Sequence, residues 1–147
     1  MSFPIVNRDF PIDPAGLLPA ITPDNEAHWS ALACGELVLQ GCADCGCVRY
    51  PIAPVCSSCG STEWEWKQLS GQGSIFSWVR YQRPYLPEFQ DLMPYAVAVI
   101  ELDEGARMYG RLIENDAEAT IGARVEIVIE RWPDGRCVPA FRIVETK

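Results

Sequence analysis

The chain has 147 residues, of which 48% are hydrophobic and 22% are charged, and its formal net charge at pH 7 is −8. These values are typical of one globular domain, or of two small domains that share a core. Phosphate contacts supply much of the affinity for nucleic acid, so an acidic chain without a basic cluster argues against a nucleic-acid-binding protein. No apolar stretch approaches the roughly 20 residues that span a bilayer, and we expect no membrane segment.

The N-terminal segment, residues 1–21, contains Pro4, Pro11, Pro14 and Pro19. Proline at this density opposes both helix and sheet. We expect an extended arm that lies on a partner or on the domain's own surface, with disorder until a partner binds as the alternative. No basic stretch followed by an apolar stretch is visible, so the sequence shows no secretory signal. Together with cysteine spacing typical of a metal site, this favours the cytoplasm.

A short helix follows the arm. Thr22 is a capping residue, Pro23 suits the first helical position, and Asp24 places an acidic residue in the first turn. The sequence therefore predicts an N-terminal helix within residues 22–36, with Gly35 ending it.

Two C-x2-C-G motifs stand ten residues apart, and together they contain Cys42, Cys45 and Gly46, then Cys56, Cys59 and Gly60. A tetrahedral metal needs four soft ligands, and two tight turns supply one pair each. Four thiolates leave no open position for a substrate, so we predict Zn²⁺ in a structural role bound by these four cysteines. Disulfides or free buried thiols are the alternative to a metal, and iron in a rubredoxin-like site is the rival metal.

The motifs lie within a segment, residues 37–69, whose pattern predicts a zinc ribbon. Leu37 and Leu39 alternate with polar residues and are expected on one face of a strand. After the second motif, Trp64 and Trp66 also alternate, and we expect them to lie on one face and cover the ribbon.

The remaining chemistry-bearing residues do not form a catalytic set in the sequence. His28 is the only histidine and has no nearby nucleophile, base or metal partner, so we interpret it as a surface or packing residue. Cys34, Cys47 and Cys137 are interpreted as small buried or half-buried residues. The sequence shows no Ser-His-Asp order and no glycine-rich phosphate loop.

The C-terminal part, residues 70–147, alternates strands and turns. The predicted strands are 74–81, 95–102, 106–113, 123–132 and 137–144. Five strands separated by turn residues over this length predict a five-stranded open barrel of the OB type, and a short sandwich is the alternative. The expected fold is therefore mainly β, with an N-terminal helix, a rubredoxin-like zinc ribbon and a C-terminal OB-fold barrel.

Short motifs in a fixed order extend over residues 22–144. They are Thr22-Pro-Asp-Asn with Trp29, Gly35-Glu-Leu, the two cysteine motifs around Tyr50-Pro51, Leu69-Ser-Gly with Gly73, Pro94-Tyr95, Glu101-Leu-Asp-Glu-Gly, Ile121-Gly122, and Pro139 with Phe141. Each motif is weak alone, but in this order the chain resembles the Zn-ribbon/OB-fold acyl-CoA-associated proteins, long known as a domain of unknown function.

The resemblance implies a small partner subunit in a hetero-oligomer rather than an enzyme on its own. Proteins of this family work beside thiolase-fold enzymes: thiolases, acyltransferases, hydroxymethylglutaryl-CoA-type synthases and lipid-transfer-type aldolases of steroid side-chain degradation. Some are bound to hydratase-like chains. The resemblance further implies that the ribbon contacts the large enzyme, that the barrel helps to hold the acyl-CoA, and that the complex makes or breaks a carbon–carbon bond.

One segment of the barrel offers the residues that a CoA ligand would need. CoA carries phosphates and an adenine, so its site requires arginines and aromatic side chains together. The candidate ligand residues are Trp78, Arg80, Tyr81, Arg83 and Tyr85. In the alternative interpretation Trp78 belongs to the core and Arg80 is solvated, and the same aromatic loop is a contact patch for a protein partner.

Two other functions are compatible with a ribbon joined to a barrel. A nucleic-acid-binding module is permitted by the folds but opposed by the sequence pI of about 4.6. A rubredoxin-like electron carrier would require iron at the four cysteines and would be coloured.

Overall fold

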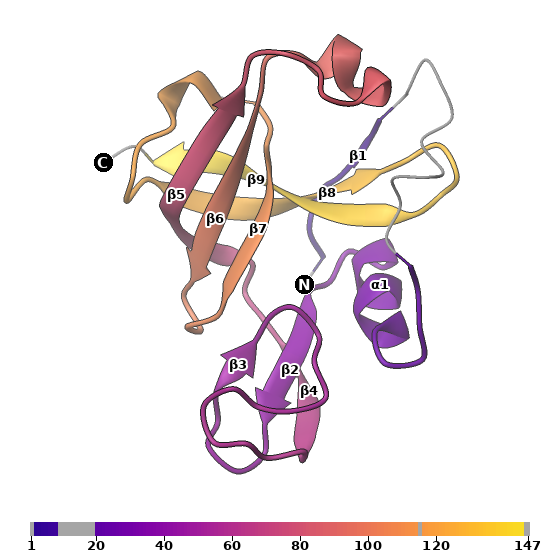
Figure 1. The fold of residues 1–147 in the computed structure, drawn as a ribbon, viewed down its shortest axis with the longest axis vertical. Helices are drawn as coiled ribbons and strands as arrows, with labels where there is room; N and C mark the ends of the chain where they lie inside the picture. The colour runs from indigo at the N-terminus through magenta and orange to yellow at the C-terminus, as the bar shows by residue number, and fades with distance from the viewer. Residues whose placement is uncertain (1, 9–19, 115, 146–147) are drawn as a thin grey trace.

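The computed structural model describes residues 2–8, 20–114 and 116–145. The molecule is mainly β, with a small three-stranded sheet at one end, a barrel at the other, and one helix beside their junction (Figure 1). The predicted fold class is confirmed.

Helix α1 spans Glu26–Ala33, so it begins later than the threonine-capped start that the sequence suggests. The side-chain Oδ1 of Asn25 accepts the backbone N–H of Thr22 at 2.7 Å, and this bond holds the preceding residues in a separate turn. Thr22 therefore starts this turn and does not cap the helix. The prediction of Thr22 as the capping residue was wrong. The end is as expected, because Gly35 has a φ of +82° just after the last helical turn.

The small sheet contains the ribbon. Its strands are β2 (Val38–Cys42), β3 (Val48–Arg49) and β4 (Trp64–Gln68), in the order β3-β2-β4 with antiparallel pairing. Leu37 and Leu39 are fully buried. They face the barrel, so the predicted common face of these two leucines is confirmed and turns out to be the junction of the two parts.

The barrel is built from β5 (Gln72–Tyr81), β6 (Tyr95–Leu102), β7 (Arg107–Leu112), β8 (Arg124–Arg131) and β9 (Cys137–Glu145). Strands β5, β6 and β7 form an antiparallel meander, β7 pairs with β9 in parallel, and β9 pairs back through β8 to β5. This closed order is that of an OB fold. Two short 3-10 helices, η2 (Pro87–Leu92) and η3 (Asp116–Glu118), occupy connections between strands.

Strand β5 does not keep the simple alternation that its sequence suggests. Its register against β6 shifts between Ile75 and Ser77, which is a β-bulge at Phe76. Ile75 is buried in the core and Trp78 packs against the same core, although three positions separate them. A regular strand would place these two residues on opposite faces.

The described part of the N-terminal arm lies on the domain's own surface, and residues 9–19 of the predicted arm lie outside the described residues. Strand β1 (Ile5–Asn7) pairs in parallel with β8. The backbone N–H of Phe3 donates to the carbonyl of Gly35 at 2.7 Å, next to the end of the helix. The arm therefore bridges the helix and the barrel.

One hydrophobic cluster runs through helix, ribbon and barrel. It joins Leu32 of the helix and Leu39 of the ribbon to inward-facing barrel residues such as Ile100, Ile127 and Phe141. All five side chains are almost completely buried. Among the described residues, the helices are all too short or too polar to cross a membrane.

The polypeptide passes from ribbon to barrel at Gly71, whose φ of +72° is a left-handed conformation that favours glycine. A Cβ at this position would overlap the Cγ2 of Ile127 and would lie 2.9 Å from the Cζ of Phe3. The arm, the joint and β8 therefore pack around a position that has no space for a side chain.

We expect Gly71→Ala to lower the free energy of unfolding by about 2–5 kcal/mol, because left-handed strain adds to overpacking. Gly135→Ala is the matched control, since Gly135 has a φ of +91° but nothing within 4 Å of a Cβ. Urea unfolding followed by tryptophan fluorescence measures both. Equal losses in the two variants would contradict the packing at the joint.

His28 is a packing residue, buried on α1 with 1% of its surface exposed. Its Nδ1 lies 2.9 Å from the carbonyl oxygen of Val38, and its ring meets Trp29 edge to face at 4.9 Å between centroids. Tyr50 is the next ring, at 6.3 Å. Burial lowers the pKa of His28 below its ordinary 6.5, so the folded protein favours the neutral imidazole.

This burial predicts a pH-dependent stability. The contribution of neutral His28 is fully present above pH 6.5 and is lost as the pH falls from 6.5 toward the lowered pKa of the folded state, because the unfolded chain then binds a proton that the folded chain does not. In His28→Gln, which keeps a donor for Val38 but cannot titrate, the slope of unfolding free energy against pH should be smaller by up to about 1.4 kcal/mol per pH unit. Parallel curves of unfolding free energy against pH for the wild type and His28→Gln below pH 6.5 would contradict this role of His28.

Candidate functional site

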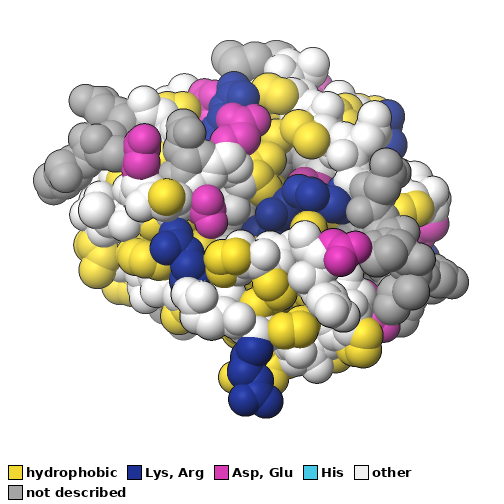
Figure 2. Space-filling view, turned by 90° about the horizontal axis from the view of Figure 1, so that it is seen from above, with side chains coloured by type: hydrophobic (Ala, Val, Ile, Leu, Met, Phe, Trp, Pro, Cys, Tyr) yellow, Lys and Arg dark blue, Asp and Glu magenta, His cyan; other side chains and the backbone are white. Residues whose placement is uncertain are grey.

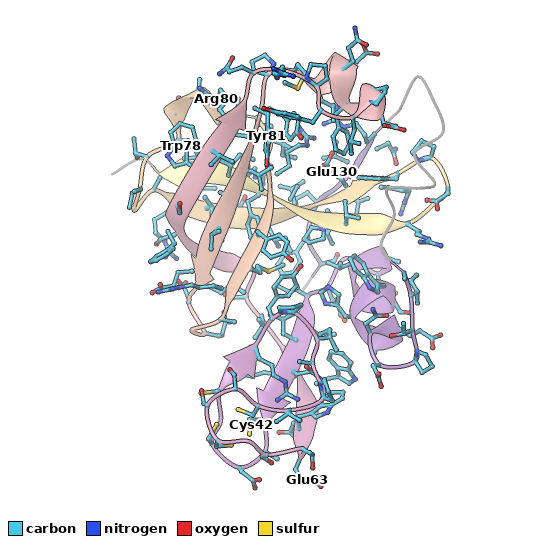
Figure 3. All side chains as sticks on the ribbon, in the orientation of Figure 1. Cys42, Glu63, Trp78, Arg80, Tyr81 and Glu130 are labelled. Atoms are coloured by element: carbon cyan, nitrogen blue, oxygen red, sulfur yellow. The ribbon has the colours of Figure 1, made fainter. Side chains whose placement is uncertain are left out.

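The two cysteine motifs form matching turns at the tip of the ribbon (Figure 3). The backbone N–H of Gly46 donates to the carbonyl of Cys42 at 3.0 Å, and Gly60 donates to Cys56 at 2.9 Å. Both glycines have a φ of +80°. The left-handed glycine lets each turn close, and this brings the two sulfurs of each motif together.

The four predicted ligands, Cys42, Cys45, Cys56 and Cys59, lie together. Their Sγ atoms are all within 4.8 Å of one another. The distance is 3.6 Å between the first and fourth sulfurs and also 3.6 Å between the second and third. Sulfurs around a tetrahedral metal with bonds of about 2.3 Å are about 3.8 Å apart, whereas a disulfide needs about 2.0 Å. All seven cysteines are free thiols, so the donors fit a metal ion.

Backbone N–H groups favour the thiolate form in this cluster. The N–H of Cys45 donates to the Sγ of Cys42 at 3.5 Å, and this interaction lowers the pKa of the Cys42 thiol to about 6. The N–H of Cys59 lowers the pKa of Cys56 in the same way. Backbone hydrogen bonds to Cys45 and Cys59 act in the same direction, but burial and hydrogen bonds with the neighbouring sulfurs outweigh them, and the pKa of Cys45 is raised to about 12 and that of Cys59 is also raised. Since the thiolate is the metal ligand, a cation bound by all four sulfurs must displace the protons that these two thiols retain.

The three other cysteines differ from one another. Cys137 is buried in the core as expected, but Cys34 and Cys47 are exposed, so the prediction of burial was wrong for these two. The Cys47 thiol donates to the hydroxyl of Ser58, in the second cysteine motif, at 3.3 Å. Its sulfur is outside the four-sulfur cluster.

Under the cluster, the ribbon has a polar interior that the sequence did not reveal. The Nε of Arg49 donates to the Oε1 of Gln40 at 3.0 Å, and its Nη2 donates to the carbonyl of Ala53 at 2.9 Å. Trp64 lies 5.9 Å from the guanidinium carbon and meets Trp66 edge to face at 4.8 Å. The tryptophans cover the ribbon from one face, as predicted.

The five candidate ligand residues of the barrel fall into two separate groups. Trp78 and Arg80 lie together, with 5.3 Å between guanidinium and ring, and Arg80 donates to the backbone carbonyl of Asp116 at 2.6 Å. Tyr81 points away from them, and Tyr85 lies 6.2 Å from its ring (Figure 3). The structure therefore does not unite all five in one site.

Arg83 belongs with the second group. Its guanidinium carbon lies 5.1 Å from the centroid of the Tyr85 ring. This part of the chain leads into η2, and the aromatic side chains there gather around Tyr95, which stacks on Tyr81 at 4.9 Å and meets Phe89 at 5.5 Å.

This aromatic cluster forms one wall of a groove on the outer face of the barrel, which we call the outer groove. Its volume is about 230 Å³, and its main lining residues are Tyr81, Phe89, Tyr95, Arg111, Glu130 and Trp132. Figure 2 views this end of the molecule and shows basic side chains set in a hollow between hydrophobic ones.

The floor of the outer groove holds a buried ion cluster. Glu130 is only 4% exposed, and its Oε2 accepts from the Nε of Arg8 at 3.0 Å and from the Nη2 of Arg111 at 2.6 Å. Arg111 also donates through Nε to Oε1 at 3.2 Å. Arg8 directly follows β1, Arg111 lies on β7 and Glu130 lies on β8. Because these elements are far apart in the sequence, sequence inspection did not bring the three residues together.

Two sequence models match adjoining parts of the chain. The rubredoxin-like zinc ribbon domain of ChsH2 matches residues 29–65, and the C-terminal OB-fold domain of ChsH2 matches residues 66–130. The boundary between the matches falls in β4, the last strand of the ribbon.

Curated relatives are similar over much of the chain. A probable enoyl-CoA hydratase alpha subunit of Thermomonospora curvata is 39% identical over 65% of this chain and 29% of the relative. The 3-oxo-4,17-pregnadiene-20-carboxyl-CoA hydratase alpha subunit of Mycobacterium tuberculosis is 32% identical over 84% of this chain and 39% of the relative. A DUF35 domain-containing scaffold protein of Methanothermobacter thermautotrophicus is 36% identical over 61% of this chain and 68% of the relative. The chain thus spans well under half the length of both hydratase subunits.

Two solved structures share the fold. A chain of the Ltp2-ChsH2(DUF35) aldolase superposes with a TM-score of 0.75 and 34% identity, covering 86% of this chain and 98% of that chain. A DUF35 family protein of unknown function from Sulfolobus solfataricus has a TM-score of 0.60 and 16% identity over 82% of this chain and 85% of that chain.

The fold and the sulfur cluster define a protein that joins a four-cysteine ribbon to an OB-fold barrel. The matches then place it: the chain belongs to the DUF35 family, with both domains of the ChsH2 type. The resemblance predicted from the ordered motifs is confirmed.

We expect Cys59→Ser to abolish metal binding and to unfold the ribbon, since a structural zinc site contributes roughly 10 kcal/mol or more of binding free energy. Cys47→Ser, on the same tip but outside the cluster, should keep one metal per chain. Elemental analysis with thermal melts measures both, and visible absorption distinguishes iron from zinc. A normal melt of Cys59→Ser with its metal retained would contradict the structural role.

Proposed function

We propose that this chain is a non-catalytic subunit of a larger enzyme complex that acts on acyl-CoA thioesters. The observation that carries the proposal is the 34% identity with a chain of the Ltp2-ChsH2(DUF35) aldolase, over 98% of that chain. The names of other relatives, CoA hydratase alpha subunits and DUF35 scaffold proteins, agree with a role inside an assembly.

The chemistry of the described residues agrees with a non-catalytic role for this chain. His28 is buried among aromatic rings and is inaccessible to a substrate. The two cysteine pairs of the ribbon are grouped as a metal site. Under this proposal the nucleophile and the general base of the reaction come from the partner.

The finer proposal concerns the partner and the reaction. The partner is a larger chain of thiolase fold, and the complex forms or cleaves a carbon–carbon bond next to the thioester carbonyl. The metal is Zn²⁺ held by Cys42, Cys45, Cys56 and Cys59, and its role is to fix the ribbon as a contact surface for the partner. The barrel holds part of the acyl-CoA. Tyr81 and Tyr85 are the members of the predicted set that line a groove, and Arg83 lies against the Tyr85 ring.

We expect the tagged chain to capture a thiolase-fold protein from an extract of its own cells, and the purified pair to turn over an acyl-CoA that neither chain converts alone. Mass spectrometry identifies the partner, and thioester consumption is followed by release of free CoA. The tag alone serves as the control. An identified partner without activity on any thioester, or a chain that stays monomeric in the extract, would overturn the proposal.

A further inference from the structure

The outer groove has the walls of a site for a flat ring. Tyr81, Phe89, Tyr95 and Trp132 line it. The rings of Tyr81 and Tyr95 stack on each other, and Phe89 meets Tyr95 edge to face. The groove's volume of about 230 Å³ is below the roughly 300–1,000 Å³ of a pocket for a drug-sized ligand, so it fits one ring system rather than a whole cofactor. Stacking on such side chains suits any nucleobase.

The floor of the groove can recognise the polar edge of such a ring. A carboxylate has about four acceptor positions, and the three hydrogen bonds to Glu130 leave one on Oε1. Arg111 has five N–H donors, of which two are used in these bonds. A free acceptor beside free donors matches the edge of a purine, where an exocyclic amino group adjoins a ring nitrogen.

The charge of the groove favours an anion, although the whole chain is acidic. Two arginines, Arg8 and Arg111, face the single carboxylate of Glu130, which leaves one surplus positive charge in this cluster of described residues. A second hollow of about 420 Å³, lined also by Tyr85 and Leu86, shares Tyr81, Phe89 and Tyr95 with the outer groove.

Arg83 lies next to this second hollow, because it contacts Tyr85, one of the lining residues. It lies against the Tyr85 ring, and the ion pairs among the described residues do not include it. Its guanidinium is therefore available to an incoming phosphate, which it is shaped to bind through two parallel hydrogen bonds.

We propose that the outer groove binds an adenine nucleotide, with the purine against the aromatic side chains next to Arg111 and Glu130 and the phosphate at Arg83. The source of the nucleotide rests on the proposed function: in an acyl-CoA complex it is the 3′-phosphoadenosine end of CoA. A free adenosine phosphate has the same chemistry, and the two sources are separable by the position of the phosphate.

The test is calorimetric titration of the full chain, loaded with metal, with adenosine 3′-phosphate and with adenosine 5′-phosphate, which have the same charge and differ only in the position of the phosphate. Tighter binding of the first compound assigns the groove to CoA, and equal binding assigns it to a free nucleotide. The phosphopantetheine half of CoA should not bind. Absence of binding by both nucleotides at millimolar concentration would overturn the proposal.

Tyr81→Leu removes one stacking ring but keeps an apolar side chain, and it should weaken nucleotide binding about 5- to 100-fold. Phe76→Leu is the matched control, because Phe76 is an exposed aromatic on the same strand but outside the groove. An unchanged affinity in Tyr81→Leu, or an equal loss in both folded variants, would refute the assignment.

Arg83→Gln should weaken binding of both nucleotides severalfold, leave binding of adenosine itself unchanged, and reduce the salt dependence. Its control is Arg107→Gln, because Arg107 also lies over an exposed ring, that of Phe76, at 3.8 Å. Equal effects in the two arginine variants would refute the phosphate position.

The two proposals fail independently. A complex that turns over acyl-CoA with the same KM in wild type and Tyr81→Leu would overturn the groove and leave the subunit role intact. A chain that binds the nucleotide through Tyr81 but joins no thioester-converting partner would retain the groove and overturn the subunit role.

Discussion

The shared hydrophobic core between the ribbon and the barrel is the constraint on which the rest of the structure depends. Leu37 and Leu39 of the ribbon are fully buried against barrel residues, so neither part can complete its core without the other. Burial of leucine contributes roughly 1.5–3 kcal/mol for each side chain, which is large for so small a sheet. The tip of the ribbon and the outer groove are consequently held in a fixed relation.

The other face of the ribbon is packed by polar side chains, unlike the apolar junction with the barrel. The face away from the barrel is filled by Gln40 and Arg49 rather than by aliphatic side chains, and Trp64 and Trp66 cover them. Hydrogen-bonded polar groups contribute little net stability when buried. The three-stranded sheet therefore relies on its junction with the barrel at one end and on the sulfur cluster at the other.

Local patterns in the sequence predicted the elements well but not their exceptions. Alternation located all five barrel strands, and paired C-x2-C-G motifs located the sulfur cluster, because both signals act over a few neighbouring residues. The bulge at Phe76 was missed because it depends on pairing with another strand. The turn at Thr22 was missed because it depends on a hydrogen bond from the backbone N–H of Thr22 to the side chain of Asn25, which a capping pattern alone does not predict.

The candidate ligand site shows the same limit more sharply. Neighbours in sequence such as Arg80 and Tyr81 point to opposite sides of one strand, which a period of two already requires. The groove itself joins Tyr81 to Glu130, and Glu130 to Arg8 and Arg111, through strand pairings that the sequence does not reveal. Only the aromatic residues near η2 carried a local signal.

The parallel pairing of β1 with β8 has a consequence for the order of events during synthesis. β1 leaves the ribosome before every other described strand, yet its partner is among the last to emerge. The cysteine tip and the β5–β6 hairpin need only nearby residues and are complete much earlier. Contacts between distant parts of a chain form slowly, so we expect the cysteine tip to be able to bind metal before the barrel closes, and the arm to dock late.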